Sequence, residues 1–175
     1  MIGDSRSNEH HSLTVIHTLW MREHNRLAQL LKNQHPKWND EKLYQEARRI
    51  VIAEYQHIIY KEWLPQILGL PLMKNTKLYP LEDGYVDNYK EDDFDPRITN
   101  EFAVAAFRFG HSLIPSSFKK VTRNRESRAQ DLKTIFFEPR KLFEEPGMYY
   151  LVIKSLIKLG FISRMCLDLL VMYHF

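Results

Sequence analysis

The sequence lacks most of the features that place a protein in a class on their own. It has one cysteine, Cys166, which excludes an internal disulfide framework and a cysteine zinc site. Its net charge is only +3, and no dense Lys/Arg face with interleaved aromatic residues indicates nucleic-acid binding. The polar, acid-containing start MIGDSRSNEHH does not resemble a signal peptide. No membrane span is expected, because charges interrupt the apolar stretch after Tyr149: Lys154, Lys158, Arg164 and Asp168.

What the sequence does have is apolar residues at helical spacing. It is 44% hydrophobic and 27% charged, so it can build a core, and its length suits one domain or part of one. The spacing predicts helices over residues 12–33, 40–64 and 98–113, and a helical pattern returns from Leu142. Residues 76–97 and 116–131 are predicted as loops, and no useful strand alternation occurs. The fold class is therefore mainly α.

The segment FAVAAFRFGHSLIP, residues 102–115, is apolar on every side and predicts a buried helix. Gly110 would cost such a helix about 0.5–1 kcal/mol relative to alanine, unless a flat, bulky group lies close to the backbone. Arg108 stands one turn before His111 and could meet a negative group at the same place. Two interpretations are open: His111 is a haem-iron ligand, or it is a core histidine hydrogen-bonded to the backbone.

The stretch GDSRSNEHH, residues 3–11, is a short polar run with Arg6 and Glu9 three residues apart. An arginine there could stabilise negative charge that develops on an oxygen. The alternative is a helix start, because Ser5 and Ser7 precede an acidic residue.

Three other patterns are weaker. His17 and His24 lie on one helix face without a third ligand, and Glu54-x-x-His57 has the spacing of di-iron sites without the second copy such sites need. The acidic residues of 82–95 do not follow the EF-hand order for Ca²⁺. Ion pairs such as Glu23 with Arg26, or solvated loops, explain these patterns as well.

Three long stretches, GDSRSNEHHSLTVIHTLWMREHNRLA, LYQEARRIVIAEYQHIIYKEWLPQILG and DPRITNEFAVAAFRFGHSLI, stand in an order and spacing that resemble the animal haem peroxidases. Within that family the peroxidasin-like and chorion-type branches are the most similar. The resemblance covers residues 1–147 and implies that they form the central part of a large, all-helical catalytic domain. Residues 148–175 form a divergent helical tail that keeps only a trace of the family sequence.

The resemblance implies a role for four residues. His111 matches the proximal ligand of the haem iron, and Arg108 matches an arginine near the haem propionate. Arg6 matches the distal arginine that helps to cleave bound peroxide. Glu9 matches a glutamate that can form an ester with a b-type haem, whereas His10 stands where one branch has a haem-linked methionine.

The implied activity is a haem peroxidase that uses hydrogen peroxide to oxidise a halide or a small phenolic donor, in a parent protein expected to be secreted. In the family, the distal histidine, a second ester-forming acid and the Ca²⁺ loop precede the first stretch, at which this chain begins. We therefore expect a fragment without the distal histidine or the Ca²⁺ loop and without full activity. The alternative is a catalytically inactive, peroxidase-derived binding or structural module. Neither the reducing substrate nor the oligomeric state follows from the sequence.

Overall fold

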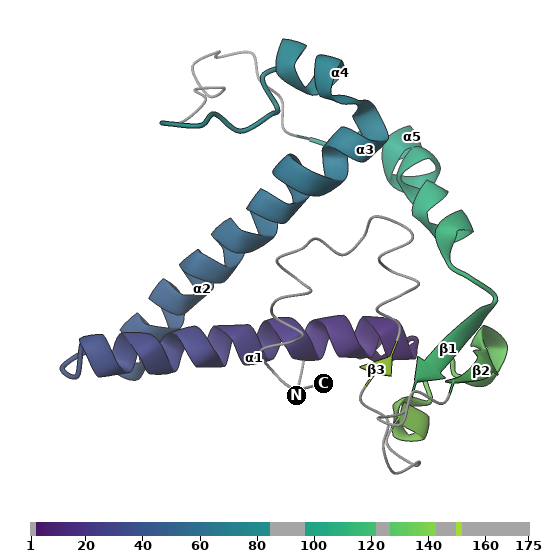
Figure 1. Ribbon diagram of the computed structural model, residues 1–175, viewed down its shortest axis with the longest axis horizontal. Coiled ribbons are helices and arrows are strands. Elements are labelled where there is room, and N and C mark those ends of the chain that lie inside the picture. The colour runs from purple at the N-terminus through teal and green to yellow at the C-terminus, as the bar shows by residue number, and fades with distance from the viewer. Residues whose placement is uncertain (1–2, 85–96, 122–126, 143–149, 152–175) are drawn as a thin grey trace.

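The computed structural model describes residues 3–84, 97–121, 127–142 and 150–151. Two long helices, α1 (His11–Gln34) and α2 (Asp40–His57), meet where α1 ends and diverge from there (Figure 1). The chain then turns through short helices and returns to the beginning of α1 as a small sheet (Figure 1). The molecule is mainly helical, as predicted. In the part of the chain that is described, no helix is long and apolar enough to cross a membrane.

Both long helices begin at a side chain that caps their free N–H groups. The Asn39 side chain accepts a hydrogen bond from the Lys42 backbone N–H at 2.9 Å, and Asp40 and Glu41 occupy the first turn of α2. Negative charge at this end complements the helix dipole. At the start of α1, the His10 ring nitrogen Nδ1 accepts from the Leu13 N–H at 3.4 Å. The predictions for residues 12–33 and for the start of the second helix are confirmed.

The second helix was predicted to continue to residue 64, and this prediction is wrong in detail. α2 gives way at His57 to a π-helical segment, η2 (Ile58–Trp63), followed by α3 (Leu64–Leu68). Proline lacks an N–H and tolerates only the first turn of a helix, and Pro65 occupies that position in α3. A left-handed Gly69 (φ +79°) then separates α3 from α4 (Leu70–Asn75).

The loop predicted over residues 116–131 contains a β-hairpin instead. Strand β1 (Ser117–Val121) pairs antiparallel with β2 (Ser127–Asp131), with Phe118 opposite Gln130. A two-residue strand, β3 (Tyr150–Leu151), pairs with the other edge of β1, giving the order β2-β1-β3. These strands carry few apolar residues, so the alternation that identifies a half-buried strand is absent from the sequence.

The helix predicted over residues 98–113 is neither continuous nor buried. It forms α5 (Asn100–Val104) and, after a break at Ala105, the 3₁₀ helix η3 (Ala106–Leu113). Its large apolar side chains remain exposed, Val104 at 72% and Phe107 at 57%. No other described segment covers them, so the burial that an all-apolar helix demands is not provided within this part of the chain.

Most of the buried apolar residues lie in two places, and Met73 of α4 is buried as well. One lies along α1 and α2 and includes Leu19, Leu43 and Ala47. The other joins the hairpin to the beginning of α1: Phe118, Ile135 and Leu142 are buried, with Val15 and Leu132 packed against them. In the tail that was predicted as helical, Tyr150–Leu151 is a strand, and residues 152–175 lie outside the described part of the chain. Residues 85–96 of the predicted loop also lie outside it.

Candidate haem-binding segments

The two predicted site segments belong to different parts of the chain, one directly before α1 and the other directly before the hairpin. Residues 3–11 form the 3₁₀ helix η1 (Ser5–Asn8) and the first residue of α1, and η3 carries Arg108 and His111. No hydrogen bond or ion pair within the described ranges joins Arg6 or Glu9 to Arg108 or His111. Each segment is therefore described separately.

Arg6 is held by Asp4, a partner that the sequence did not predict. The Asp4 carboxylate caps η1 by accepting from the Arg6 backbone N–H at 2.9 Å. It also accepts from the Arg6 side chain, from Nε at 3.0 Å and from Nη2 at 2.5 Å. These bonds to Arg6 lower the pKa of Asp4 to about 2, and the carboxylate in turn raises the pKa of the Arg6 guanidinium. Arg6 is consequently a fixed cation, although its side chain is 79% exposed.

Glu9 and His10 connect η1 to the hairpin region. The Glu9 carbonyl accepts a hydrogen bond from the Phe137 N–H at 2.9 Å. The His10 ring stacks on Phe118 of β1, with ring centroids 5.6 Å apart and planes 20° apart. Burial lowers the pKa of His10, and only the nearby Glu9 opposes this. His10 is thereby kept neutral, as its capping role at Leu13 requires.

His11, the next residue, adds another connection. It is almost fully buried, and its Nε2 lies 3.0 Å from the carbonyl oxygen of Glu138. A carbonyl oxygen can only accept, so Nε2 carries the proton. The start of α1 is therefore anchored to β1 by His10 and to the chain after β2 by His11, and this anchoring fixes the backbone from which Arg6 and Glu9 project.

η3 presents imidazole, guanidinium and aromatic groups together on the surface. His111 and Arg108 are exposed, and among the described residues the His111 ring makes no hydrogen bond. The Arg108 guanidinium lies over the Phe107 ring, 5.7 Å from its centroid. A Cβ added at Gly110 would meet nothing within 4 Å. In the part of the chain that is described, His111 is therefore exposed and has no backbone hydrogen bond from its ring, and the side of η3 at Gly110 is open.

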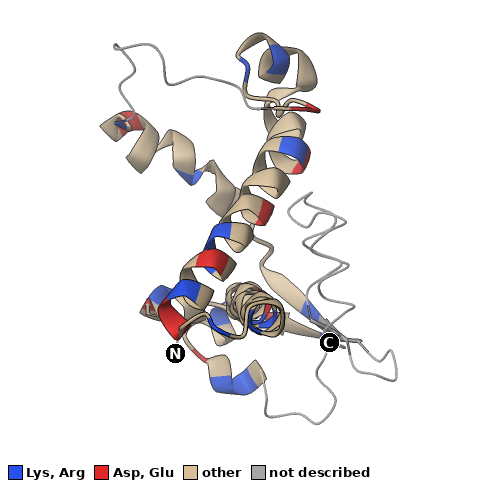
Figure 2. Cartoon of the chain, turned by 90° about the vertical axis from the view of Figure 1, so that its left-hand side faces the viewer, with Lys and Arg blue, Asp and Glu red and all other residues tan. Residues whose placement is uncertain are grey.

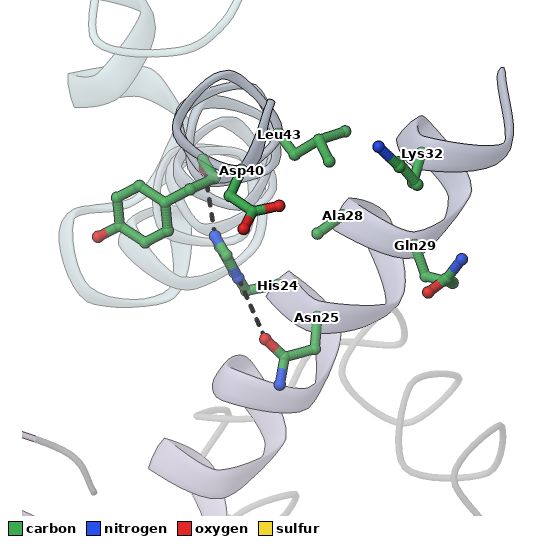
Figure 3. A pocket seen from close by; sticks show the side chains of 8 residues that line it. His24, Asn25, Ala28, Gln29, Lys32, Asp40 and Leu43 are labelled. Carbon is green, nitrogen blue, oxygen red and sulfur yellow. Dashed lines mark hydrogen bonds between the residues drawn. The ribbon is translucent and has the colours of Figure 1, made fainter. Parts of the chain in front are cut away.

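The weaker metal patterns gain no support. His24 lies in an open pocket between α1 and α2 (Figure 3), where its Nε2 donates to the Tyr44 carbonyl at 3.2 Å and its Nδ1 is 3.4 Å from Asn25 Oδ1. Both ring nitrogens therefore face oxygen atoms of the protein, and His17 is exposed. No group of three metal-ligating side chains occurs in the described residues, which include Glu54 and His57 but few of the acidic residues at 82–95.

Comparison with known proteins identifies what these segments are similar to. A family model described as animal haem peroxidase matches residues 1–160. The chain is 45% identical over 142 residues to the chorion peroxidase of Aedes aegypti, covering 81% of this chain and 18% of that protein. It is 42% identical over 151 residues to the peroxidasin homolog of Homo sapiens, covering 85% and 10%.

Solved structures agree with the sequence comparison. Peroxidase A from Dictyostelium discoideum superposes with a TM-score of 0.63 and 32% sequence identity, covering 80% of this chain and 25% of that one. The chain spans less than a fifth of the length of the chorion peroxidase and of the peroxidasin homolog. The resemblance seen in the three sequence stretches is confirmed at the level of the family.

Proposed function

Because this chain belongs to the animal haem peroxidase family, we propose that it forms part of a peroxidase that reduces hydrogen peroxide and oxidises a halide or a phenolic donor. The family match over residues 1–160 carries this proposal, since it includes both candidate site segments. Family membership implies a haem cofactor, and the exposed groups of η3 have the chemistry to hold one.

The η3 surface fits haem through its donor set. His111 offers an exposed imidazole, the ligand with which peroxidases hold haem iron. Arg108, one turn earlier, carries a permanent positive charge that suits a propionate carboxylate. The open side of Gly110 and the exposed Phe107 ring would accept a flat apolar group. We assign the axial ligand to His111 and the propionate contact to Arg108.

The bound haem would supply the redox chemistry, and the protein residues would position it and stabilise charge. Arg6 is the group suited to the peroxide side. Asp4 occupies Nε and Nη2 of the guanidinium, which leaves the Nη1 hydrogens for another acceptor. Those hydrogens can bond to an oxygen on which negative charge develops, and Asp4 keeps the guanidinium oriented meanwhile.

Several finer features belong to the same proposal. Glu9 follows η1 directly, three residues after Arg6 in the same polar segment, and is the residue that could form an ester with the haem. A Ca²⁺ site and secretion of the parent protein are proposed from the family alone. The inactive alternative, a peroxidase-derived binding module, would keep haem at His111 without turnover.

Peroxide turnover tests the proposal and separates it from that alternative. The chain would be reconstituted with haemin, and oxidation of a phenolic donor by hydrogen peroxide would be compared with free haemin. We expect turnover above free haemin but below that of a complete peroxidase, and Arg6→Ala should lower it toward the free-haemin rate, because one charge-stabilising donor is lost. Arg48→Ala, an exposed arginine of α2, is the matched control. Histidine-ligated haem with no turnover above free haemin would favour the binding module.

A further inference from the structure

A fully buried carboxylate lies between α1 and α2, away from both haem-binding segments. The Glu23 side chain has 0% exposure and accepts two hydrogen bonds from Arg26, from Nε to Oε2 at 2.8 Å and from Nη2 to Oε1 at 2.6 Å. Arg26 remains 32% exposed. A buried charge is stable only when it is paired and hydrogen-bonded, and this bidentate ion pair meets that condition for Glu23.

A second carboxyl group reaches the same interface from α2. Ala47 of α2 and Ile58, the first residue of η2, are buried, and Glu54 is seven residues after the first and four before the second, hence on the same stripe. Tyr55 contacts the ring of Trp20, one turn before Glu23, edge to face with centroids 5.4 Å apart. Glu54 therefore stands opposite Glu23.

The environment of Glu54 does not suit a second negative charge. Its Oε2 atom is buried and has no hydrogen-bond partner among the described residues. Burial raises the pKa of Glu54, the Glu23 carboxylate raises it further, and Arg26 lowers it. Glu23 and Arg26, both on α1, are the charged groups that act on Glu54 in the part of the chain described. One guanidinium thus serves two carboxyl groups.

We propose that Glu54 and Glu23 share one proton across the α1–α2 interface and that this pair, with Arg26, makes the packing of the two helices depend on pH. In this arrangement the protonated Glu54 carboxyl donates through Oε2, and the Glu23 carboxylate accepts while it keeps its bonds to Arg26. The buried oxygen then has a partner, and the three groups together are electrically neutral. The proposal concerns the helix pair alone and does not depend on haem.

The direction of the pH effect follows from linkage. A carboxyl group whose pKa is higher in the folded protein than its ordinary value of 4.5 holds its proton more tightly when folded. At pH values below the ordinary pKa, this carboxyl group does not lower the free energy of unfolding. As the pH rises above the ordinary pKa and through the folded pKa, the group lowers the free energy of unfolding more and more. The packing of α1 against α2 should therefore be more stable at mildly acidic pH, where Glu54 keeps its proton, than at higher pH, where Glu54 is ionised.

The first test compares wild type with Glu54→Gln, which keeps the shape and a donor but cannot ionise. Thermal unfolding of the 175-residue chain would be followed by helical circular dichroism from about pH 4 to about pH 8. We expect the variant to unfold at a higher temperature near pH 8, with the difference vanishing near pH 4. Glu46→Gln removes a carboxylate from an exposed ion pair with Arg49 on the same helix. As the control it should show no such gain.

The second test asks where the proton is. In wild type, infrared spectroscopy should show a protonated carboxylic acid band at pH values above the ordinary pKa of 4.5, and Glu54→Gln should remove that band. In a Glu23→Gln background, Glu54→Gln should give less stabilisation than in wild type, because the repulsion between the two groups is already gone. Absence of the infrared band, or a Glu54→Gln effect that is destabilising or the same at every pH, would overturn the proposal.

Discussion

The α1–α2 pair and the α5–η3 segment are both rich in apolar residues, yet only the first buries them. Leu19 and Ala47 have 0% exposure where the two long helices pack, whereas Phe102 and Phe109 of α5–η3 are 46% and 44% exposed. The difference is one of partners. Each long helix covers the apolar side chains of the other, whereas no described segment covers those of α5–η3. An exposed apolar surface of this kind is typical of a ligand-binding or interaction site.

The largest effect that should separate the two regions is that of a truncated apolar side chain. Leu19→Ala would leave a cavity in a fully buried position and should destabilise the chain by about 2–5 kcal/mol. Val104→Ala, at 72% exposure, should change stability by no more than about 0.5 kcal/mol. Chemical denaturation of both variants measures the difference. Equal effects would show that α5–η3 is buried in solution and that the comparison fails.

An intermediate effect is expected at the junction of η1 and α1. His10→Ala removes the cap of Leu13 and the stacking on Phe118, and the lost cap alone should cost about 0.5–2 kcal/mol at neutral pH. Because burial lowers the pKa of His10 below 6.5, its contribution should be present above that pH and lost as the pH falls through the folded pKa.

The matched variant for this site is His10→Asn. Asparagine is a good N-cap residue and does not titrate, so this variant should recover part of the lost stability without the pH dependence. Denaturation of the three proteins at about pH 8 and at about pH 5 would show it. If the difference in stability between wild type and His10→Asn were the same at both pH values, the neutral, capping role of His10 would be contradicted.

The smallest effect is expected at Asp4, because the ion pair with Arg6 is exposed. Asp4→Asn should barely change the unfolding temperature at neutral pH. The contribution of Asp4 should be present above its ordinary pKa of 3.8 and lost as the pH falls through about 2. The local effect should be larger: amide hydrogen exchange at Arg6 and Ser7 should accelerate as η1 frays. Unchanged exchange there would show that Asp4 does not hold η1.

Sequence patterns predicted the elements whose stability is local and missed those that depend on distant contacts. The first two helices followed from apolar spacing and from Asn39 as an N-cap, and both signals lie within a few residues. The hairpin at 117–131 was missed because its strands bury only Phe118 among their described side chains, against residues far along the chain. The break at Ala105 was missed because an all-apolar segment predicts a continuous buried helix, and this pattern carries no information on which segments pack against it.

The candidate site shows the same division. Resemblance to the family singled out Arg6, Glu9, Arg108 and His111, and their roles remain proposals. The Asp4 side chain that fixes Arg6 was not predicted, although an aspartate two residues before the arginine, at a helix start, is a signal for it. The exposure of His111 could not have been predicted, because exposure depends on which segments pack against η3.

Titration of the chain with haemin tests the central claim, that His111 holds the haem iron, most directly. The Soret and visible bands would be recorded for wild type, for His111→Ala and for His57→Ala, an exposed histidine of α2 that serves as the control. We predict a histidine-ligated ferric spectrum in wild type and in His57→Ala that is lost in His111→Ala. The same spectrum in all three proteins would contradict the assignment of His111 as the axial ligand.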